Sequence, residues 1–296
     1  MASHFGDRLA TALRTTGTPL CVGIDPHMNL LPALFCQEGV PTLEGLRRFS
    51  QNVIKAAAGL VPAVKPQAAM FEAFGPEGVS ILADTAKAAQ QAGLLVIMDA
   101  KRGDIGSTSA AYAKAYLGAD APFPSDALTI NPWMGIDTLM PFIDRAKETN
   151  SGLFILMRTS NGGSADLQEL VTDGEFVYQN LAKKCAPLIE EANGQSGLSS
   201  IGIVAGATVP EQAEALRRLL PSAPFLIPGF GAQGAGPAHA TIALSKEKGA
   251  FGGGLVNSSR GIIFCEEAQK AETDEAHIKA MRTAIIEQIA LLNSAL

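Results

Sequence analysis

Residues 94–108 read LLVIMDAKRGDIGST, an apolar run that ends in a cluster of ionisable side chains. The apolar part has no helical spacing and the length of one strand, which predicts a strand buried on both faces. Asp99, Lys101 and Asp104 follow in the pattern D-x-K-x-x-D. If Asp99 and Lys101 both lie on the strand, its two-residue period places them on the same side. Charges there are costly unless paired, so a structural ion pair is one interpretation and a catalytic site is the other.

The residues after the charged pattern predict a turn into a helix. Gly103 and Gly106 loosen the turn, and Ser107 or Thr108 is expected to cap the helix that begins there. Together with the third carboxylate, these glycines favour the catalytic interpretation over a structural ion pair.

Strand-like and helix-like runs alternate along almost the whole chain. Strands are expected at 19–25, 63–66, 94–98, 127–131, 153–157, 201–205, 225–228 and 251–256. Helices are expected near 43–60, 76–92, 136–148, 174–193, 210–220, 236–246 and 266–292, and after the charged pattern up to about 117. Alternation of this kind predicts a parallel sheet.

Eight strand–helix units suit an α/β fold of the (β/α)8 TIM-barrel type, with residues 1–296 as a single domain. A doubly wound sheet is the structural alternative. The long connections 26–42 and 161–173 are interpreted as insertions over one face of the barrel.

Composition and charge limit the class of protein. The chain has 296 residues, of which 47% are hydrophobic and 18% charged, as in soluble globular proteins. No apolar run approaches the roughly 20 residues of a membrane helix, and residues 1–8 lack the order of a signal peptide. We therefore expect a cytoplasmic protein without a membrane partner. The net charge of −6 argues against a nucleic-acid partner.

The cysteines and histidines show no metal-binding or disulfide spacing. The cysteines, which we expect to be free thiols, are Cys21, Cys36, Cys185 and Cys265. The histidines, which we expect at the surface, are His4, His27, His239 and His277. Since no histidine has a partner four residues away, no metal site is expected.

Polar residues follow the predicted strands, where the carboxyl ends of a barrel carry catalytic groups. They are Asp25, Lys65, Asp99, Lys101, Asn131, Ser160, Pro228 and Arg260. Singly, each has an ordinary explanation, since a strand-end aspartate often forms a turn and a lysine is often solvated. As a set emerging from apolar strands, they predict a polar site at one end of the barrel.

The seventh predicted strand runs into G-x-G-x-x-G, since residues 225–234 read FLIPGFGAQG. A dinucleotide site is one interpretation, but it requires an acid about 20 residues further on, and none lies between Gly234 and Glu247. Barrels often bind phosphate with the loops after strands seven and eight. Arg260, after the eighth strand, supplies a positive fork for a phosphate dianion. A phosphate-binding loop is therefore favoured.

Two other enzyme classes are less well supported. Ser160 lies in T-S-N and not in G-x-S-x-G, which argues against a hydrolase triad. A Schiff-base aldolase would also place a lysine on a strand. However, two acids beside Lys101 favour its ammonium form, which is a poor nucleophile.

The segment DAKRGDIGST at 99–108 closely resembles the signature of the orotidine 5′-phosphate decarboxylases, which convert orotidine 5′-monophosphate (OMP) to UMP. Further segments agree with that family, namely CVGIDP at 21–26, VKP at 64–66, RTSN at 158–161, PGFGAQG at 228–234 and Arg260. The size of the chain and its long fifth connection resemble the larger bacterial, type 2 branch. The 26–42 insertion and the triple glycine at 252–254 depart from the compact pattern of the family.

The resemblance implies a cofactor-independent decarboxylase of OMP, the last step of de novo pyrimidine nucleotide synthesis. It implies that Lys101 donates a proton to C6 of the pyrimidine and is held by Asp99 and Asp104, with Lys65 completing the charged row. In the family the second Asp of the pattern reaches into the neighbouring subunit, which implies a homodimer that needs Asp104. The implied substrate-binding residues are Asp25 (ribose), Ser160 (pyrimidine), Pro228, Gln233 and Arg260 (phosphate), Thr108 and Asn131.

Two alternatives stay open. A keto-gulonate phosphate decarboxylase shares the D-x-K-x-x-D strand and would need Mg2+, but the Ser160 and Gln233 segments favour a nucleotide substrate. A catalytically silent barrel that senses nucleotide monophosphate is the other alternative. The complete set of Lys65, Asp99, Lys101 and Asp104 argues against it, because a sensor does not need a buried charged row.

Overall fold

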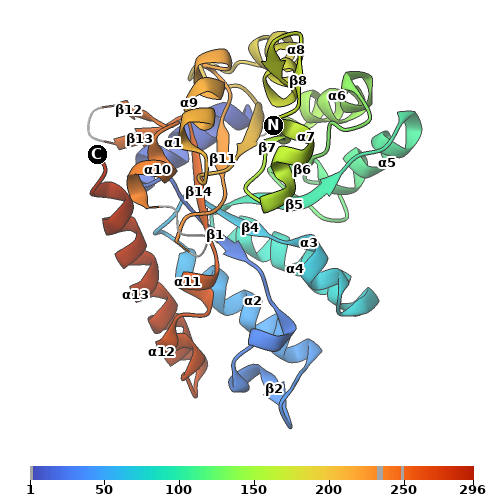
Figure 1. The fold of residues 1–296 in the computed structure, drawn as a ribbon. Coiled ribbons are helices and arrows are strands. Elements are labelled where there is room, and N and C mark those ends of the chain that lie inside the picture. Colours follow the sequence, from blue (N-terminus) through green and yellow to red (C-terminus); the bar gives the residue numbers. More distant parts are fainter. Residues whose placement is uncertain (1–2, 232–235, 248–249) are drawn as a thin grey trace.

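The computed structural model of the chain describes residues 3–231, 236–247 and 250–296. Eight parallel strands form a closed barrel in which β14 pairs with β1 (Figure 1). In barrel order they are β1 (Leu20–Ile24), β4 (Ala63–Pro66), β5 (Leu95–Arg102), β6 (Ala127–Ile130), β7 (Gly152–Arg158), β10 (Ile201–Ala205), β11 (Phe225–Ile227) and β14 (Gly254–Ser258). The closed sheet confirms the predicted barrel and excludes the doubly wound alternative.

Helices surround the barrel, as expected when βαβ connections cover a parallel sheet (Figure 1). They are α1 (Phe5–Thr16), α2 (Leu43–Ala57), α3 (Ala68–Glu72), α4 (Gly75–Gln91), α5 (Gly106–Tyr116), α6 (Met140–Thr149), α7 (Ala165–Gln168), α8 (Val177–Glu191), α9 (Pro210–Leu219), α10 (Pro237–Thr241), α11 (Arg260–Ile263), α12 (Glu266–Gln269) and α13 (Asp274–Asn293). Short 3-10 turns lie at Met28–Leu30, Ala33–Phe35, Ile136–Leu139 and Gly162–Ser164.

In the described part of the chain, three small two-stranded antiparallel sheets lie outside the barrel: β2 (Cys36–Gln37) with β3 (Val40–Pro41), β8 (Val171–Thr172) with β9 (Glu175–Phe176), and β12 (Ser245–Glu247) with β13 (Ala250–Gly252). The first belongs to the long 26–42 connection, which projects from the rest of the molecule near the label β2 in Figure 1. The second belongs to the connection after β7. Both long connections therefore carry structure of their own.

The interior of the barrel is filled by alternate residues of the strands. The buried inner cluster contains Cys21, Ala63, Ile97, Ala127, Phe154, Val204, Leu226 and Leu255. Helix α1, which the sequence did not predict, adds Phe5, Leu9 and Leu13 to this cluster, and the Phe5 ring meets the Phe154 ring edge-on at 6.1 Å. Because side chains on a strand repeat every two residues, the next inward positions are Lys65, Asp99 and Thr129. An apolar layer thus lies directly beneath a polar one.

Several predicted boundaries are wrong, for local reasons. Helix α5 begins at Gly106 with Ile105 as its N-cap, so Ser107 and Thr108 lie in its first turn and neither caps it. The helix predicted at 174–193 begins only at Val177, because the chain before it forms the β8–β9 hairpin.

The C-terminal third departs furthest from the prediction. The helix expected at 236–246 ends at Thr241, and the chain then enters the β12–β13 hairpin. The eighth strand was expected at 251–256, but Gly253 has a φ of 79° and divides that segment between β13 and β14. The helix expected at 266–292 is likewise divided into α12 and α13, the second capped by the side chain of Thr273.

His277 contradicts the expectation of surface histidines. It is fully buried, with its ring 4.9 Å from that of Phe35 and 5.7 Å from that of Phe49. Burial lowers the pKa of His277 from 6.5 to about 4, so the ring is neutral at pH 7. The four cysteines are free, as predicted.

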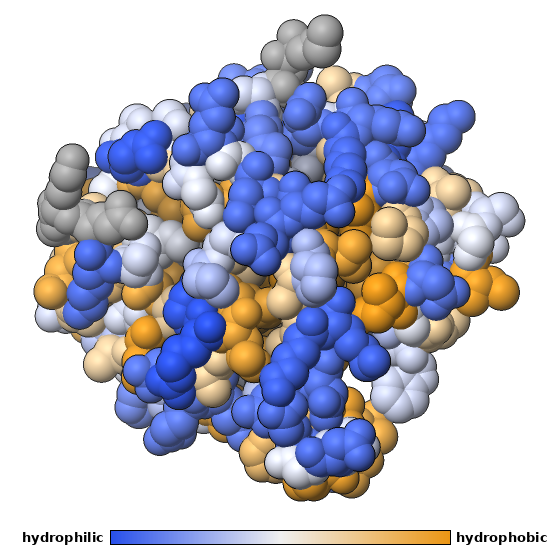
Figure 2. Space-filling view, turned by 90° about the horizontal axis from the view of Figure 1, so that it is seen from above, coloured by the Kyte–Doolittle hydropathy of each residue, from blue (hydrophilic) through white to orange (hydrophobic). Residues whose placement is uncertain are grey.

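The surface carries intermixed polar and apolar residues, as the face drawn in Figure 2 shows. The large apolar side chains that are most exposed include Trp133 at 70%, Val171 at 66% and Ile105 at 63%. Within the described residues, no helix combines the length and the apolar character needed to cross a membrane.

Candidate active site

The carboxylate of Asp99 is the centre of the polar layer at the carboxyl end of the barrel. Its Oδ2 accepts hydrogen bonds from Nζ of Lys65 at 2.7 Å and Nε2 of Gln67 at 3.0 Å. Its Oδ1 accepts from Nζ of Lys101 at 2.6 Å and Oγ1 of Thr129 at 3.0 Å. These donors come from three neighbouring strands and the turn after β4, so closure of the barrel assembles the cluster.

The charges of the cluster are strongly coupled. Burial alone would raise the pKa of Asp99, but the charges of Lys65 and Lys101 outweigh it and hold that pKa well below its usual range. Burial alone would lower the pKa of Lys65, but Asp99 and Asp25 outweigh it and raise that pKa. Both groups are therefore ionised at neutral pH, and each compensates the burial of the other.

Exposure within this cluster is unequal. The side chains of Lys65 and Asp99 are 6% and 9% exposed, whereas that of Lys101 is 47% exposed. Lys101 therefore presents its own positive charge at the surface of the carboxyl end of the barrel, beside the buried pair of Lys65 and Asp99. The exposed part of the Lys101 side chain is open to a bound molecule while Nζ keeps its contact with Asp99.

Asp25 lies beside this cluster, at the end of β1. Its Oδ1 is 4.0 Å from Nζ of Lys65, and it is buried without a hydrogen-bond partner among the described atoms. Buried carboxylate oxygens normally accept hydrogen bonds, so this atom has unused hydrogen-bonding capacity beside the charged cluster. Oδ1 of Asn257 is a second buried acceptor without a described partner, and it lies on β14, the strand that pairs with β1.

Asp104, the last member of the predicted row, lies apart from the other three. Its Oδ1 accepts a hydrogen bond from the backbone N–H of Ile105 at 2.7 Å, in the loop between β5 and α5. Among the described residues, no Lys, Arg or His side chain lies within 4.0 Å of its carboxylate. The described residues of the chain thus bring together Lys65, Asp99 and Lys101 but not Asp104.

Two of the remaining predicted residues lie next to the charged strand. Asn131 follows β6, accepts from the backbone N–H of Trp133 at 3.0 Å and is exposed. A Cβ on Gly103 would lie 2.8 Å from the carbonyl oxygen of Asn131, so this close approach requires a glycine. Thr108 is exposed on the first turn of α5.

Three more predicted residues follow the strands on the other side of the barrel. Ser160 lies two residues after β7 and packs against Gly206, where a Cβ would lie 2.8 Å from that of Ser160. Pro228 follows β11, and its carbonyl accepts from the N–H of Ala207 at 3.0 Å. Arg260 is exposed at the first residue of α11, two residues after β14. Gln233 lies outside the described residues.

Arg158, at the end of β7, was not among the predicted site residues. Its buried guanidinium forms an ion pair with Glu169 and also donates to Gln212, Ser164, Gln168 and the carbonyl of Thr159. These contacts fix the loop that carries Ser160. The signal in the sequence was an arginine at the end of an apolar strand. Gln67 and Thr129 were missed because neither residue type is chemically distinctive alone.

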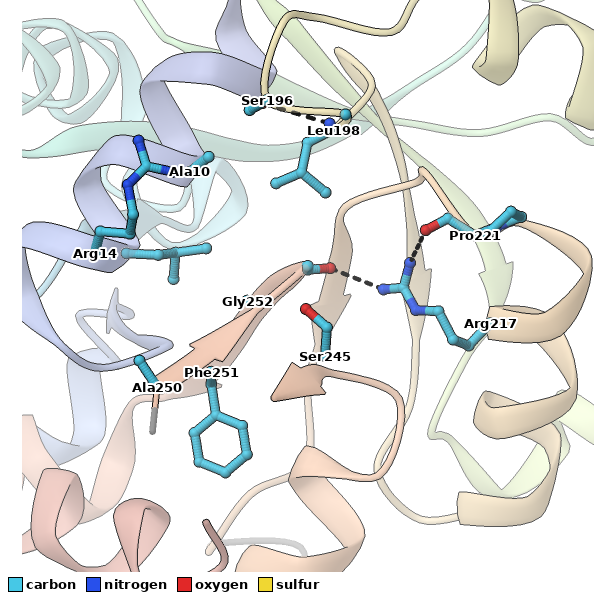
Figure 3. Close-up of a pocket in the computed structure, with 13 residues that line it drawn as sticks. Ala10, Arg14, Ser196, Leu198, Arg217, Pro221, Ser245, Ala250, Phe251 and Gly252 are labelled. Carbon is cyan, nitrogen blue, oxygen red and sulfur yellow. Dashed lines mark hydrogen bonds between the residues drawn. The ribbon is translucent and has the colours of Figure 1, made fainter. Parts of the chain in front are cut away.

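A cavity of about 620 Å3 at the opposite end of the barrel does not belong to this site (Figure 3). It lies among α1, the β12–β13 hairpin and residues that precede β10, β11 and β14. Arg217 in its wall donates to the carbonyls of Leu220, Pro221, Ala223, Ala243 and Gly253, and burial lowers the pKa of Arg217 to about 10. This arginine ties the loops at the amino ends of the strands together, which is a structural role.

The chain is similar to known proteins over most of its length. A family model described as "Orotidine 5'-phosphate decarboxylase / HUMPS family" matches residues 18–274. The orotidine 5′-phosphate decarboxylase of Rhodopirellula baltica is 41% identical over 295 residues, 96% of this chain and 97% of that protein. That of Streptomyces coelicolor is 46% identical over 261 residues, 88% of this chain and 89% of that protein. The structure of Leishmania donovani OMP decarboxylase has a TM-score of 0.77 at 29% identity, covering 99% of this chain and 98% of that one.

Proposed function

Because this chain belongs to the orotidine 5′-phosphate decarboxylase / HUMPS family, we propose that it converts OMP to UMP and CO2 without a cofactor. This reaction is the last step of de novo pyrimidine nucleotide synthesis. The observation that carries the proposal is the carboxylate of Asp99, held between the ammonium groups of Lys65 and Lys101 at 2.7 and 2.6 Å.

The chemistry requires such an arrangement. When the bond between C6 and the carboxylate breaks, CO2 leaves and its electron pair stays on C6, where ring resonance does not disperse it. A preorganised ammonium beside C6 stabilises this charge and then donates a proton to form the C6–H bond. The assignment of both steps to Lys101 is supported by its contact with Asp99, which fixes Nζ, and by a side chain that is nearly half exposed. The lysine regains its proton from solvent.

The other polar residues bind the parts of OMP that do not react. Asp25 accepts from a ribose hydroxyl, a role supported by its place at the carboxyl end of β1 beside Lys65 and by a carboxylate oxygen without a described hydrogen-bond partner. Ser160 contacts the pyrimidine. Arg260, with Pro228 and Gln233, binds the phosphate at the loops after the seventh and eighth strands of the barrel, where barrels often bind phosphate. Contacts with the phosphate, which is remote from C6, contribute to the rate when their binding energy is used to organise the charged residues around Lys101.

Thr108 and Asn131 complete the substrate-binding set next to the charged strand. Asn131 lies at the end of β6, and Thr108 lies on α5 after the D-x-K-x-x-D loop. Both side chains are exposed in one protomer, which leaves them free to meet substrate or a second subunit.

We further propose a cytoplasmic homodimer in which Asp104 completes the active site of the neighbouring subunit. The absence of an ion pair for Asp104 among the described residues of its own protomer supports this assignment, as do the exposed Ile105 and Trp133 nearby. We also assign the chain to the larger bacterial, type 2 branch of the family, on its length of 296 residues and the long connection after β7.

The proposal is tested by following the near-ultraviolet absorbance of OMP with purified protein, with and without EDTA. Loss of OMP with formation of UMP, unaffected by EDTA, would support it. EDTA-sensitive turnover of a keto-gulonate phosphate, with none of OMP, would favour a Mg2+-dependent relative. Tight UMP binding without turnover would instead favour a silent nucleotide-binding barrel.

A further inference from the structure

The pairing of β5 with β6 changes register beside the charged cluster. Ile97 pairs with Ala127 and Met98 with Leu128, but the next pair is Arg102 with Ile130. Residues 99–101 of β5 therefore lie opposite the single residue Thr129 of β6. Extra residues of this kind form a bulge, which leaves backbone groups without ladder partners and re-aims nearby side chains.

The hydroxyl of Thr129 replaces the missing ladder partner. Its Oγ1 accepts from the backbone N–H of Ala100 at 3.1 Å and from that of Lys101 at 2.9 Å, and it donates to Oδ1 of Asp99 at 3.0 Å. A hydroxyl has one proton and two lone pairs, so the two accepted bonds, together with a proton that is donated to Asp99 at 3.0 Å and also faces the carbonyl of Met98 at 3.5 Å, use its whole hydrogen-bonding capacity. Thr129 is 1% exposed, which keeps water from taking over these contacts.

The backbone at Lys101 depends on this support. Lys101 has a φ of 49°, in the left-handed region that residues with a Cβ seldom adopt. This conformation turns the chain so that the Lys101 side chain folds back and its Nζ reaches Oδ1 of Asp99. The backbone N–H of Lys101 itself donates to Oγ1 of Thr129. One hydroxyl thus contacts the carboxylate and the backbone of the lysine that pairs with it.

We propose that Thr129 is a positioning residue for decarboxylation: its hydroxyl fixes the bulge and so holds the Lys101 ammonium at C6 of the substrate. This inference rests on the proposed function. Thr129 acts through Asp99 and Lys101 and is not assigned contact with the reacting atoms. Because a misplacement of about 1 Å can lower the rate about 100-fold, the hydroxyl is expected to affect kcat more than binding.

The test compares Thr129→Val, which keeps the branched shape and removes the hydroxyl, with Thr129→Ser, which keeps the hydroxyl. Thr85→Val is the matched control, because Thr85 is also buried and its hydroxyl bonds only the carbonyl of Ile81 in its own helix, at 2.7 Å. For each protein, kcat and KM for OMP, the Kd for UMP and the melting temperature are measured.

We expect Thr129→Val to lower kcat by about 10- to 100-fold, with the Kd for UMP changed less than about threefold. Thr129→Ser should retain kcat within about threefold, and Thr85→Val should lose stability without loss of kcat. A Thr129→Val enzyme with normal kcat would overturn the proposal. So would a loss of kcat equal in the Val and Ser variants, or a loss matched by Thr85→Val.

A further variant covers the case in which Thr129→Val does not fold. Thr129→Cys offers a thiol of similar size that accepts hydrogen bonds only weakly, so its kcat should lie clearly below that of Thr129→Ser. Equal kcat for the Cys and Ser variants would overturn the proposal. Turnover of OMP by the unsubstituted protein is measured in the same series. Its absence would contradict the proposed function, whereas turnover unaffected by the Thr129 variants would contradict only the role of Thr129.

Discussion

The Nζ of Lys101 lies 2.6 Å from Oδ1 of Asp99, which is two positions earlier on the same strand. Asp99 is buried and held by donors from two further strands, while Lys101 is half exposed. The buried carboxylate therefore serves as a fixed anchor for an ammonium that substrate can reach. This asymmetry leads to separate predictions for the two residues.

Asp99→Asn is expected to destabilise the protein as well as inactivate it. Without the carboxylate charge, Lys65 remains buried with only Asp25, 4.0 Å away, to compensate it. Removing one partner of a buried pair typically costs about 3–5 kcal/mol. Urea denaturation at pH 7 measures the change. The control is Asp84→Asn, whose exposed pair with Arg47 should contribute less than about 1 kcal/mol. Equal midpoints for both variants would contradict the prediction.

His277 is expected to make stability depend on mildly acidic pH. Its pKa is about 4 in the folded protein against 6.5 ordinarily, so between these values the unfolded chain binds a proton that the folded chain excludes. Stability from this group is therefore full above pH 6.5 and falls as the pH is lowered towards 4, by up to about 3 kcal/mol. The free energy of unfolding is measured by denaturation at several pH values for the unsubstituted protein and for His277→Gln. Plotted against pH, it should fall more steeply towards pH 4 in the unsubstituted protein, and parallel plots would refute the assignment.

Asp104 can be tested by mixing two inactive variants. If Asp104 serves the neighbouring subunit, Asp104→Ala and Lys101→Ala dimers should each be inactive. After exchange of subunits, about half the dimers are mixed and one of their two sites has both residues. About a quarter of normal activity should therefore return. If no activity returns although mixed dimers are detected, Asp104 acts within its own subunit or not at all.

Arg260→Ala is expected to weaken OMP turnover broadly. A hydrogen bond to a charged group contributes about 1.5–3 kcal/mol, so kcat/KM should fall by about 10- to 150-fold. Steady-state kinetics measure the effect, and Arg218→Ala, an exposed arginine on α9, is the control. Equal kinetics for both variants would remove Arg260 from the phosphate site.

The sequence predicted the barrel and most of its strands because each strand is a short, continuous apolar run. β10, for example, occupies the predicted 201–205 and is buried throughout. The prediction was less accurate in the C-terminal third. There the positive φ of Gly253 ends β13 and separates it from β14, although the residues on both sides of it are also glycines and give no sign of a break in the sequence. Helix α1 was missed because its burial depends on packing across the amino end of the barrel.

The site was predicted only where residue type and spacing are distinctive. Lys65, Asp99 and Lys101 are brought together as expected, since strand ends meet at one edge of a barrel. Thr129 could not be identified in this way, because its role depends on a register change between two strands. His277 was misplaced, because the aromatic rings that bury it come from distant parts of the chain.

The most direct test of the account is the kinetics of Lys101→Ala with OMP, beside Lys114→Ala, an exposed lysine on α5, as control. Loss of both the electrostatic stabiliser and the proton donor should lower kcat by at least about 1000-fold. The Kd for UMP should change far less, and the control should behave normally. Decarboxylation by Lys101→Ala at a near-normal rate would contradict the central claim that this ammonium stabilises and protonates C6.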